Sequence, residues 1–150
     1  MDWRVAYEKL ESLRRCLDRI RRKRPTTAME LIDDHDLQDI LSVNLERSIQ
    51  LCVDLASMVI ASRKSRTPQT MADCFEVLRE ERLLSDSVAA QLVKSVGFRN
   101  IAVHSYRKID WELVFQIVHN RLADFEKFAV AIAQTDRSST SDFRSLPSDA

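Results

Sequence analysis

The sequence predicts an all-α protein, an antiparallel bundle of four to five helices, and three observations support this fold class. Apolar side chains recur every three or four residues through most of the chain, which is the spacing of one face of a helix. One glycine and three prolines among 150 residues are too few for the many hairpins of a β-sandwich or β-barrel. A chain of this length that is 45% hydrophobic can bury a core without disulfides or metals.

The first predicted helix starts at Trp3 and ends near Arg24. Its apolar face repeats at threes and fours, and we assign Tyr7 on this face to the core. Pro25 ends the helix, because the residue before a proline is disfavoured in the helical conformation. A linker is expected to follow.

Two further helices are expected in the middle of the chain. An apolar stripe over residues 37–60 needs a long helix, which ends in the basic, polar segment 62–68. Residues 70–82 can form a shorter helix. Aspartates favour a helix start because their side chains accept hydrogen bonds from free backbone amides, and the long helix has several available: Asp33, Asp34 and Asp36.

The fourth predicted helix carries the candidate functional residues. Ser85 or Asp86 can cap it, and its periodic pattern continues past Gly97 to Val103. A glycine within a helix costs about 1 kcal/mol relative to alanine. Gly97 therefore indicates either a helix end or the close approach of another backbone, and we favour the close approach.

The last predicted helix is a single one, capped by Asp110 and ending near Gln134. Residues 135–150 are rich in Ser, Asp and Thr and have too little apolar surface to offset the entropy of ordering them. We therefore expect one helical domain over residues 1–134 and a disordered tail over residues 135–150.

A motif with the spacing Arg-x4-His-x-Tyr lies across the end of the fourth helix. Its three defining residues are Arg99, His104 and Tyr106. This pattern resembles the signature of HEPN-domain proteins, and the resemblance implies metal-independent RNA cleavage. Such cleavage needs a base that takes the proton of the 2′-hydroxyl and a cation that stabilises charge on the phosphoryl oxygens. Histidine titrates near neutrality, and the planar guanidinium of arginine matches phosphate geometry. His104 and Arg99 are therefore the candidate catalytic residues. Asn100 can support them by holding the phosphate or orienting His104, or it can make a structural hydrogen bond.

The spacing of the motif predicts a homodimer. Five residues at about 100° each place Arg99 and His104 about 140° apart around a continuous helix, so one helix does not easily bring both to one phosphate. Two such helices that meet near Gly97 around a two-fold axis would bring Arg99 of one subunit beside His104 of the other. The cleft would then also contain two histidines, one as base and one as acid.

The motif resembles the signature of HEPN-domain proteins, specifically of their HepT branch. The resemblance includes the lead-in at residues 96–100, the helix start at residues 108–112 and the stretch 122–126, and it extends over roughly residues 92–132. It implies a HEPN-like fold, a homodimer and a toxin of a type VII-like toxin–antitoxin system. Such a toxin is a metal-independent endoribonuclease without a cofactor, which a nucleotidyltransferase antitoxin neutralises.

The resemblance also implies a role for Tyr106 as the residue that the antitoxin adenylylates. Added AMP would bring negative charge to the mouth of the cleft and repel RNA. Two other interpretations of the motif remain open. One is a non-catalytic helical adaptor or nucleotide-binding partner of a nucleotidyltransferase, and the other is a structural bundle in which His104 and Tyr106 satisfy each other.

The remaining features of the sequence indicate a cytoplasmic protein without a metal. The cysteines lack zinc-site spacing, and the acidic residues around His35 are explained by helix capping. No apolar block is long enough for a signal peptide or a membrane span, so no membrane contact is expected. The formal net charge is zero, but basic residues gather at 14–24 and 63–66, where they could meet RNA or an acidic antitoxin surface. His119 is expected at a helix surface or seam.

Overall fold

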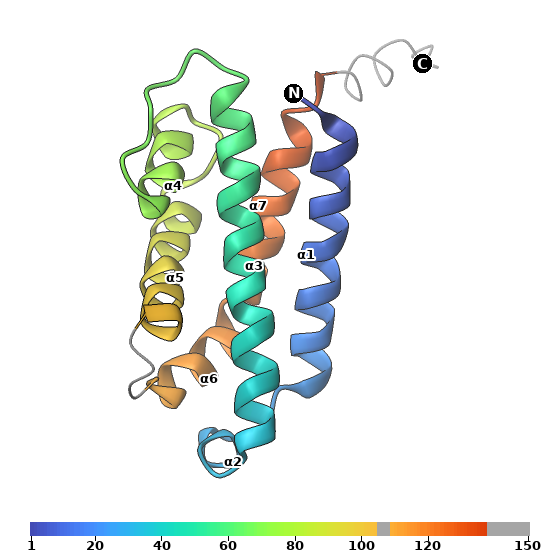
Figure 1. Ribbon diagram of the computed structural model, residues 1–150, viewed down its shortest axis with the longest axis vertical. Coiled ribbons are helices and arrows are strands. Elements are labelled where there is room, and N and C mark those ends of the chain that lie inside the picture. Colours follow the sequence, from blue (N-terminus) through green and yellow to red (C-terminus); the bar gives the residue numbers. More distant parts are fainter. Residues whose placement is uncertain (105–108, 138–150) are drawn as a thin grey trace, which may run out of the picture.

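The computed structural model describes residues 1–104 and 109–137, and within these ranges the chain forms helices and no strands. The all-α fold class is therefore confirmed (Figure 1). Seven helices follow one another in the described residues: α1 (Trp3–Lys23), α2 (Ala28–Ile32), α3 (His35–Ala61), α4 (Met71–Glu80), α5 (Asp86–His104), α6 (Trp111–Asn120) and α7 (Leu122–Gln134).

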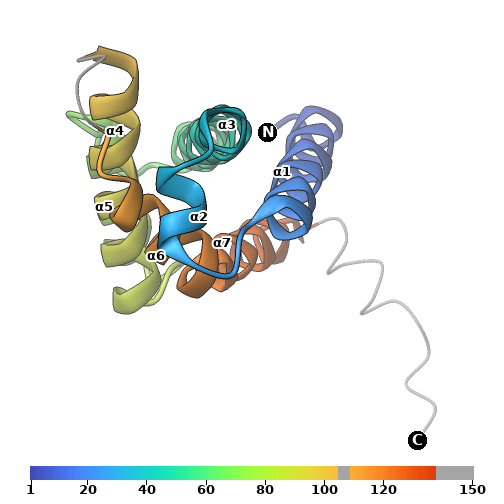
Figure 2. The ribbon, with the colours of Figure 1, turned by 90° about the horizontal axis from the view of Figure 1, so that it is seen from below.

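Helix α3 is the central element of the bundle. It lies between α1 on one side and α4 and α5 on the other, with α7 behind it (Figures 1 and 2). Its start is fixed by Asp34, whose side chain accepts a hydrogen bond from the backbone amide of Leu37 at 3.0 Å. Because α3 has neighbours on several sides, its buried positions cover more of its circumference than those of a surface helix.

The core joins all the long helices. Phe75 of α4 and Phe128 of α7 are fully buried and meet edge to face, with ring centroids 5.8 Å apart. Leu13 of α1 and Leu45 of α3 are also fully buried. None of the helices in the described ranges is both long and apolar enough to cross a membrane.

The prediction of a linker after Pro25 is wrong, because this segment contains the short helix α2. The hydroxyl of Thr27 accepts a hydrogen bond from the amide of Glu30 at 3.3 Å, and the Glu30 carboxylate accepts one from the amide of Thr26 at 3.1 Å. This reciprocal arrangement is close to a capping box, which stabilises a helix start. Thr27 is thus the N-cap of α2, which begins at Ala28.

The prediction of a single last helix is also wrong. The chain leaves the helical conformation at Arg121 and forms two helices, α6 and α7. Arg121 has φ −122° and ψ 4°, and no side chain caps the start of α7. Contacts with the end of α1 fix the orientation of α6, which differs from that of α7. The guanidinium of Arg24 donates to the carbonyl of Val118 at 3.0 Å, and His119 Nε2 lies within hydrogen-bond distance of the Pro25 carbonyl.

Tyr7 is not a core residue, contrary to the prediction, because its side chain is 42% exposed. Its hydroxyl donates to Oδ2 of Asp136 at 2.8 Å, and Asp136 is buried. This contact joins α1 to the residues that follow α7. Residues 138–150, most of the expected disordered tail, lie outside the described residues.

Candidate functional site

The motif residues lie at the C-terminal end of α5, at the same end of the bundle as α2 and α6 (Figure 1). Helix α5 continues without a break to His104, so Arg99 and His104 occupy one helix, as the spacing argument assumed. Arg99 is half-buried, whereas Asn100 and His104 are exposed. The imidazole of His104 and its neighbour Asn100 are therefore accessible to a large substrate. Tyr106 lies outside the described residues.

Arg99 has two polar neighbours. Its Nη1 donates to Oδ1 of Asn100 at 3.3 Å, so Asn100 contacts Arg99 here, and its side-chain oxygen can hold the guanidinium in place. Burial raises the pKa of the Glu46 carboxyl on α3, and the positive charge of Arg99 opposes that rise. Sequence reasoning missed Glu46, because its proximity to Arg99 depends on the packing of α3 against α5.

Gly97 is exposed, and a Cβ atom built on it would meet no atom within 4 Å beyond its chain neighbours and the local backbone of α5. The close approach expected at Gly97 is therefore not made by any described part of this chain. Next to Gly97, a cavity of about 540 Å³ opens between α5 and α6. Apolar side chains are exposed on this surface: Ile101 is 49% and Leu113 is 47% accessible. This face of α5 and α6 is thus open and partly apolar.

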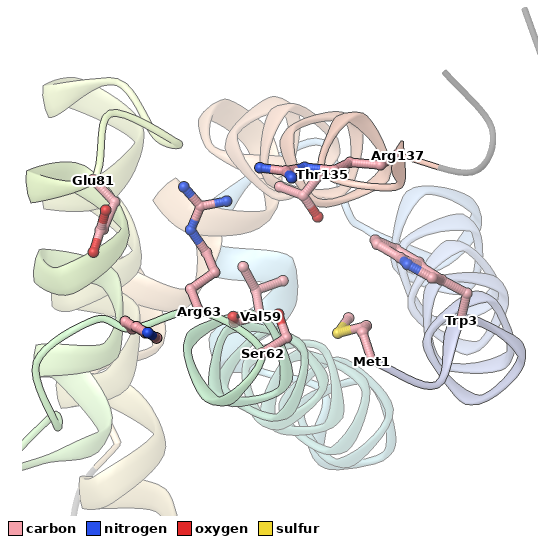
Figure 3. A pocket seen from close by; sticks show the side chains of 9 residues that line it. Met1, Trp3, Val59, Ser62, Arg63, Glu81, Thr135 and Arg137 are labelled. Carbon is pink, nitrogen blue, oxygen red and sulfur yellow. Dashed lines mark hydrogen bonds between the residues drawn. The ribbon is translucent and has the colours of Figure 1, made fainter. Parts of the chain in front are cut away.

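A second cavity lies at the opposite end of the bundle from His104, where the start of α1 meets the ends of α3 and α7 (Figures 1 and 3). It has a volume of about 570 Å³, and Figure 3 shows Trp3, Arg63 and Arg137 around it. These arginines follow the C-terminal ends of α3 and α7, where the helix dipole favours positive charge. The basic residues at 63–66 therefore do not flank the motif.

Most basic residues near the end of α1 have partners within the chain. Glu11 accepts hydrogen bonds from Arg14, Asp18 pairs with Arg22 at 3.1 Å, and Arg21 pairs with Glu126 of α7. Much of this charge is thus used in contacts on the surface of the bundle.

Metal-ligating residue types do not cluster in the described part of the chain, where no three His, Cys, Asp or Glu side chains are placed to hold an ion. The three cysteines are free, with Cys52 and Cys74 buried and Cys16 half-buried. His119 packs against Phe115 with ring centroids 4.4 Å apart and contacts Pro25, which confirms its place at a seam.

An all-helical bundle that presents an arginine and a histidine five residues apart at the exposed end of a continuous helix has the features of the HEPN class. Comparison with known proteins agrees with this assignment. The family model described as ribonuclease HepT-like matches residues 9–132, and the chain belongs to this family.

Known relatives and solved structures support the assignment. The chain is 32% identical over 124 residues to the mRNA nuclease HepT of Shewanella oneidensis, covering 83% of this chain and 92% of that protein. It is 26% identical over 121 residues to the tRNA nuclease HepT of Aphanizomenon flos-aquae, covering 81% and 82% of the two chains. The fold is similar to that of a tri-AMPylated Shewanella oneidensis HEPN toxin solved in complex with its MNT antitoxin. The TM-score is 0.80 at 31% identity, with coverage of 87% of this chain and 97% of the other.

Proposed function

We propose that this chain is the ribonuclease toxin of a toxin–antitoxin pair and that Arg99 and His104 perform the cleavage. The observation that carries the proposal is the position of these two residues at the solvent-accessible end of α5 in a member of a ribonuclease family. An RNA chain can reach His104 there without a rearrangement of the bundle.

The reaction follows from the chemistry of the two side chains. Neutral His104 takes the proton of the 2′-hydroxyl, and the oxygen attacks the adjacent phosphorus. Arg99 stabilises the negative charge that develops on the phosphoryl oxygens, with Asn100 holding its guanidinium. The bond to the 5′-oxygen breaks, and that oxygen takes a proton from a second acid. The products carry a 2′,3′-cyclic phosphate and a 5′-hydroxyl.

The proposed active form is a homodimer in which the partner copy completes the site. Arg99 and His104 diverge by about 140° around α5, so one copy of the helix does not direct both at one phosphate. The open surface beside Gly97 and the exposed side chains of Ile101 and Leu113 provide an apolar face on which a second copy can pack. In this dimer the second histidine supplies the acid for the leaving oxygen.

The proposed partner is a nucleotidyltransferase antitoxin that transfers AMP to Tyr106. The similar Shewanella oneidensis toxin is AMPylated and bound to an MNT antitoxin, which supports this part of the proposal. Tyr106 lies two residues after His104, so an added phosphate would enter the region of the cleft. The negative charge would pair with Arg99 and repel the RNA backbone.

Expression of the chain in cells, with and without the nucleotidyltransferase, tests this function. The wild type is expected to stop growth alone and to be neutralised by the partner, with AMP mapped to Tyr106 by mass spectrometry. Tyr106→Phe should remain toxic in the presence of the partner, because the acceptor oxygen is missing. Tyr7→Phe removes the other tyrosine hydroxyl and should still be neutralised. AMP on a serine or threonine, with Tyr106→Phe still neutralised, would reject this assignment.

A further inference from the structure

A groove between α1 and α3 has a basic lining that neither the fold nor the motif explains. It encloses about 550 Å³, and three arginines from the two helices line it: Arg15, Arg19 and Arg47. Half-buried Cys16 and Leu51 provide apolar surface between them. The groove therefore combines cationic walls with apolar contact area.

Two of the three arginines of this groove lack a partner in the part of the chain that the structure describes. Neither Arg19 nor Arg47 has an ion-pair or hydrogen-bond partner among the described residues. Arg15 lies 3.5 Å from Glu11, but Glu11 pairs more closely with Arg14, at 2.6 Å. Asp54, the acidic residue in the lining, is already bound by Lys9 at 3.4 Å and by Gln50 at 2.9 Å.

The positions of these arginines are not explained by the preference of cations for the C-terminal end of a helix. Arg47 lies near the middle of the 27 residues of α3, and Arg15 lies well before the last turn of α1. The helix dipole stabilises cations only within the last turn, so it does not account for them. The positive charge of Arg47 is felt inside the groove. Burial raises the pKa of the Cys16 thiol, and the charge of Arg47 opposes that rise.

The groove and the motif lie on either side of α3. Helix α3 separates α1 from α5, and Arg47 directly follows Glu46, which is within the electrostatic influence of Arg99. Packed helices are separated by about 8–10 Å, so the path from α1 across α3 to α5 is roughly 20 Å. A short single-stranded segment can span this distance with successive phosphates.

We propose that the α1–α3 groove is an RNA-binding exosite in which Arg15, Arg19 and Arg47 bind phosphates of the segment flanking the cleaved bond. The proposal rests on the proposed ribonuclease function and deepens it. Arginine forks match phosphate oxygens, and the apolar surface of Cys16 and Leu51 accommodates a base between them. An acidic protein surface would satisfy the charges without using the apolar floor, so the lining favours RNA.

Binding of a single-stranded oligoribonucleotide with 2′-O-methyl groups at every position tests the exosite, because this RNA cannot be cleaved by 2′-hydroxyl attack. Arg19→Gln and Arg47→Gln should each weaken binding and lower the slope of log affinity against log salt by about 0.7. When the salt concentration rises about fourfold, the ratio of wild-type affinity to variant affinity should therefore fall by about 2.6-fold for each variant. Arg4→Gln, an exposed arginine at the other end of α1, is the matched control and should bind as wild type.

Three results would overturn the exosite. The first is wild-type affinity and salt slope in both groove variants. The second is equal weakening by Arg4→Gln, which would indicate a general effect of net charge. The third is unchanged RNA binding with loss of antitoxin binding, which would assign the groove to the protein partner. If the wild-type chain neither binds this RNA nor cleaves the unmodified RNA of the same sequence, the ribonuclease function itself is rejected, and that outcome is distinct from a loss confined to the groove variants.

Discussion

Replacing Gly97 with alanine should have opposite effects on the folded subunit and on the dimer. Gly97 has no positive φ, and a Cβ atom at this position meets nothing within 4 Å in the subunit. Alanine should therefore stabilise α5 by about 1 kcal/mol, which for a chain of this size raises Tm by roughly 2–4 °C. In a dimer whose α5 helices meet at Gly97, the added methyl groups overpack the interface, at a cost of about 1–3 kcal/mol.

Two measurements on the same variant separate these effects. Sedimentation equilibrium should show a dimer Kd raised by roughly 5- to 150-fold, which corresponds to the cost of overpacking. Thermal unfolding of dilute, monomeric samples should show the higher Tm. The control Ala123→Gly changes an exposed residue of α7, so it should lower the stability of the subunit without altering the dimer Kd.

The refuting result is a Gly97→Ala variant that dimerises with wild-type affinity. The two α5 helices would then not meet at Gly97, and the argument that joins Arg99 of one subunit to His104 of the other would lose its geometric basis. A lower Tm in the monomer would separately contradict the open space described around Gly97.

Further predictions concern the composite site, the core and an ion pair. Mixed dimers of Arg99→Ala and His104→Ala keep one Arg99–His104 pair but lack the second histidine, so they should regain only a small part of the wild-type activity, with water as the acid; no recovery after complete subunit exchange would argue against a shared site. Phe128→Ala should lower the free energy of unfolding in urea by about 3–5 kcal/mol, because this ring is fully buried; a loss below about 1 kcal/mol would contradict the packing.

Arg66 hydrogen-bonds Asp73 and holds its pKa at about 2, below the ordinary 3.8. Since the folded pKa is the lower one, the pair stabilises the fold above about pH 3.8 and loses this effect as the pH falls toward 2. NMR titration of Arg66→Gln should return the Asp73 pKa toward its ordinary value; an unchanged pKa would contradict the pairing.

The long helices could be predicted from the sequence because each combines an apolar stripe with a recognisable start. Asp34 begins α3, and Asp110 begins α6 through a hydrogen bond to the amide of Leu113. Helix α2 had a signal as well, since Thr27 and Glu30 have the spacing of a capping box. The break at Arg121 had none: it lacks proline or glycine, and contacts between α6 and the end of α1 determine it.

The site could be predicted only in part for a related reason. Arg99, Asn100 and His104 are close in sequence, so a motif reveals them, and α5 is continuous across them. Glu46 and Arg47 belong to α3, and their positions beside Arg99 and Cys16 arise from helix packing. No local pattern distinguishes these two residues from ordinary charged positions on a helix surface.

The central claim is most directly tested by cleavage of RNA with the purified chain in excess EDTA, followed by identification of the new ends. The account predicts that the wild type cleaves RNA and leaves 2′,3′-cyclic phosphate and 5′-hydroxyl ends, while His104→Ala remains folded and inactive. Activity that is lost in EDTA and restored by magnesium, or 5′-phosphate ends produced equally by His104→Ala, would contradict the Arg99–His104 mechanism.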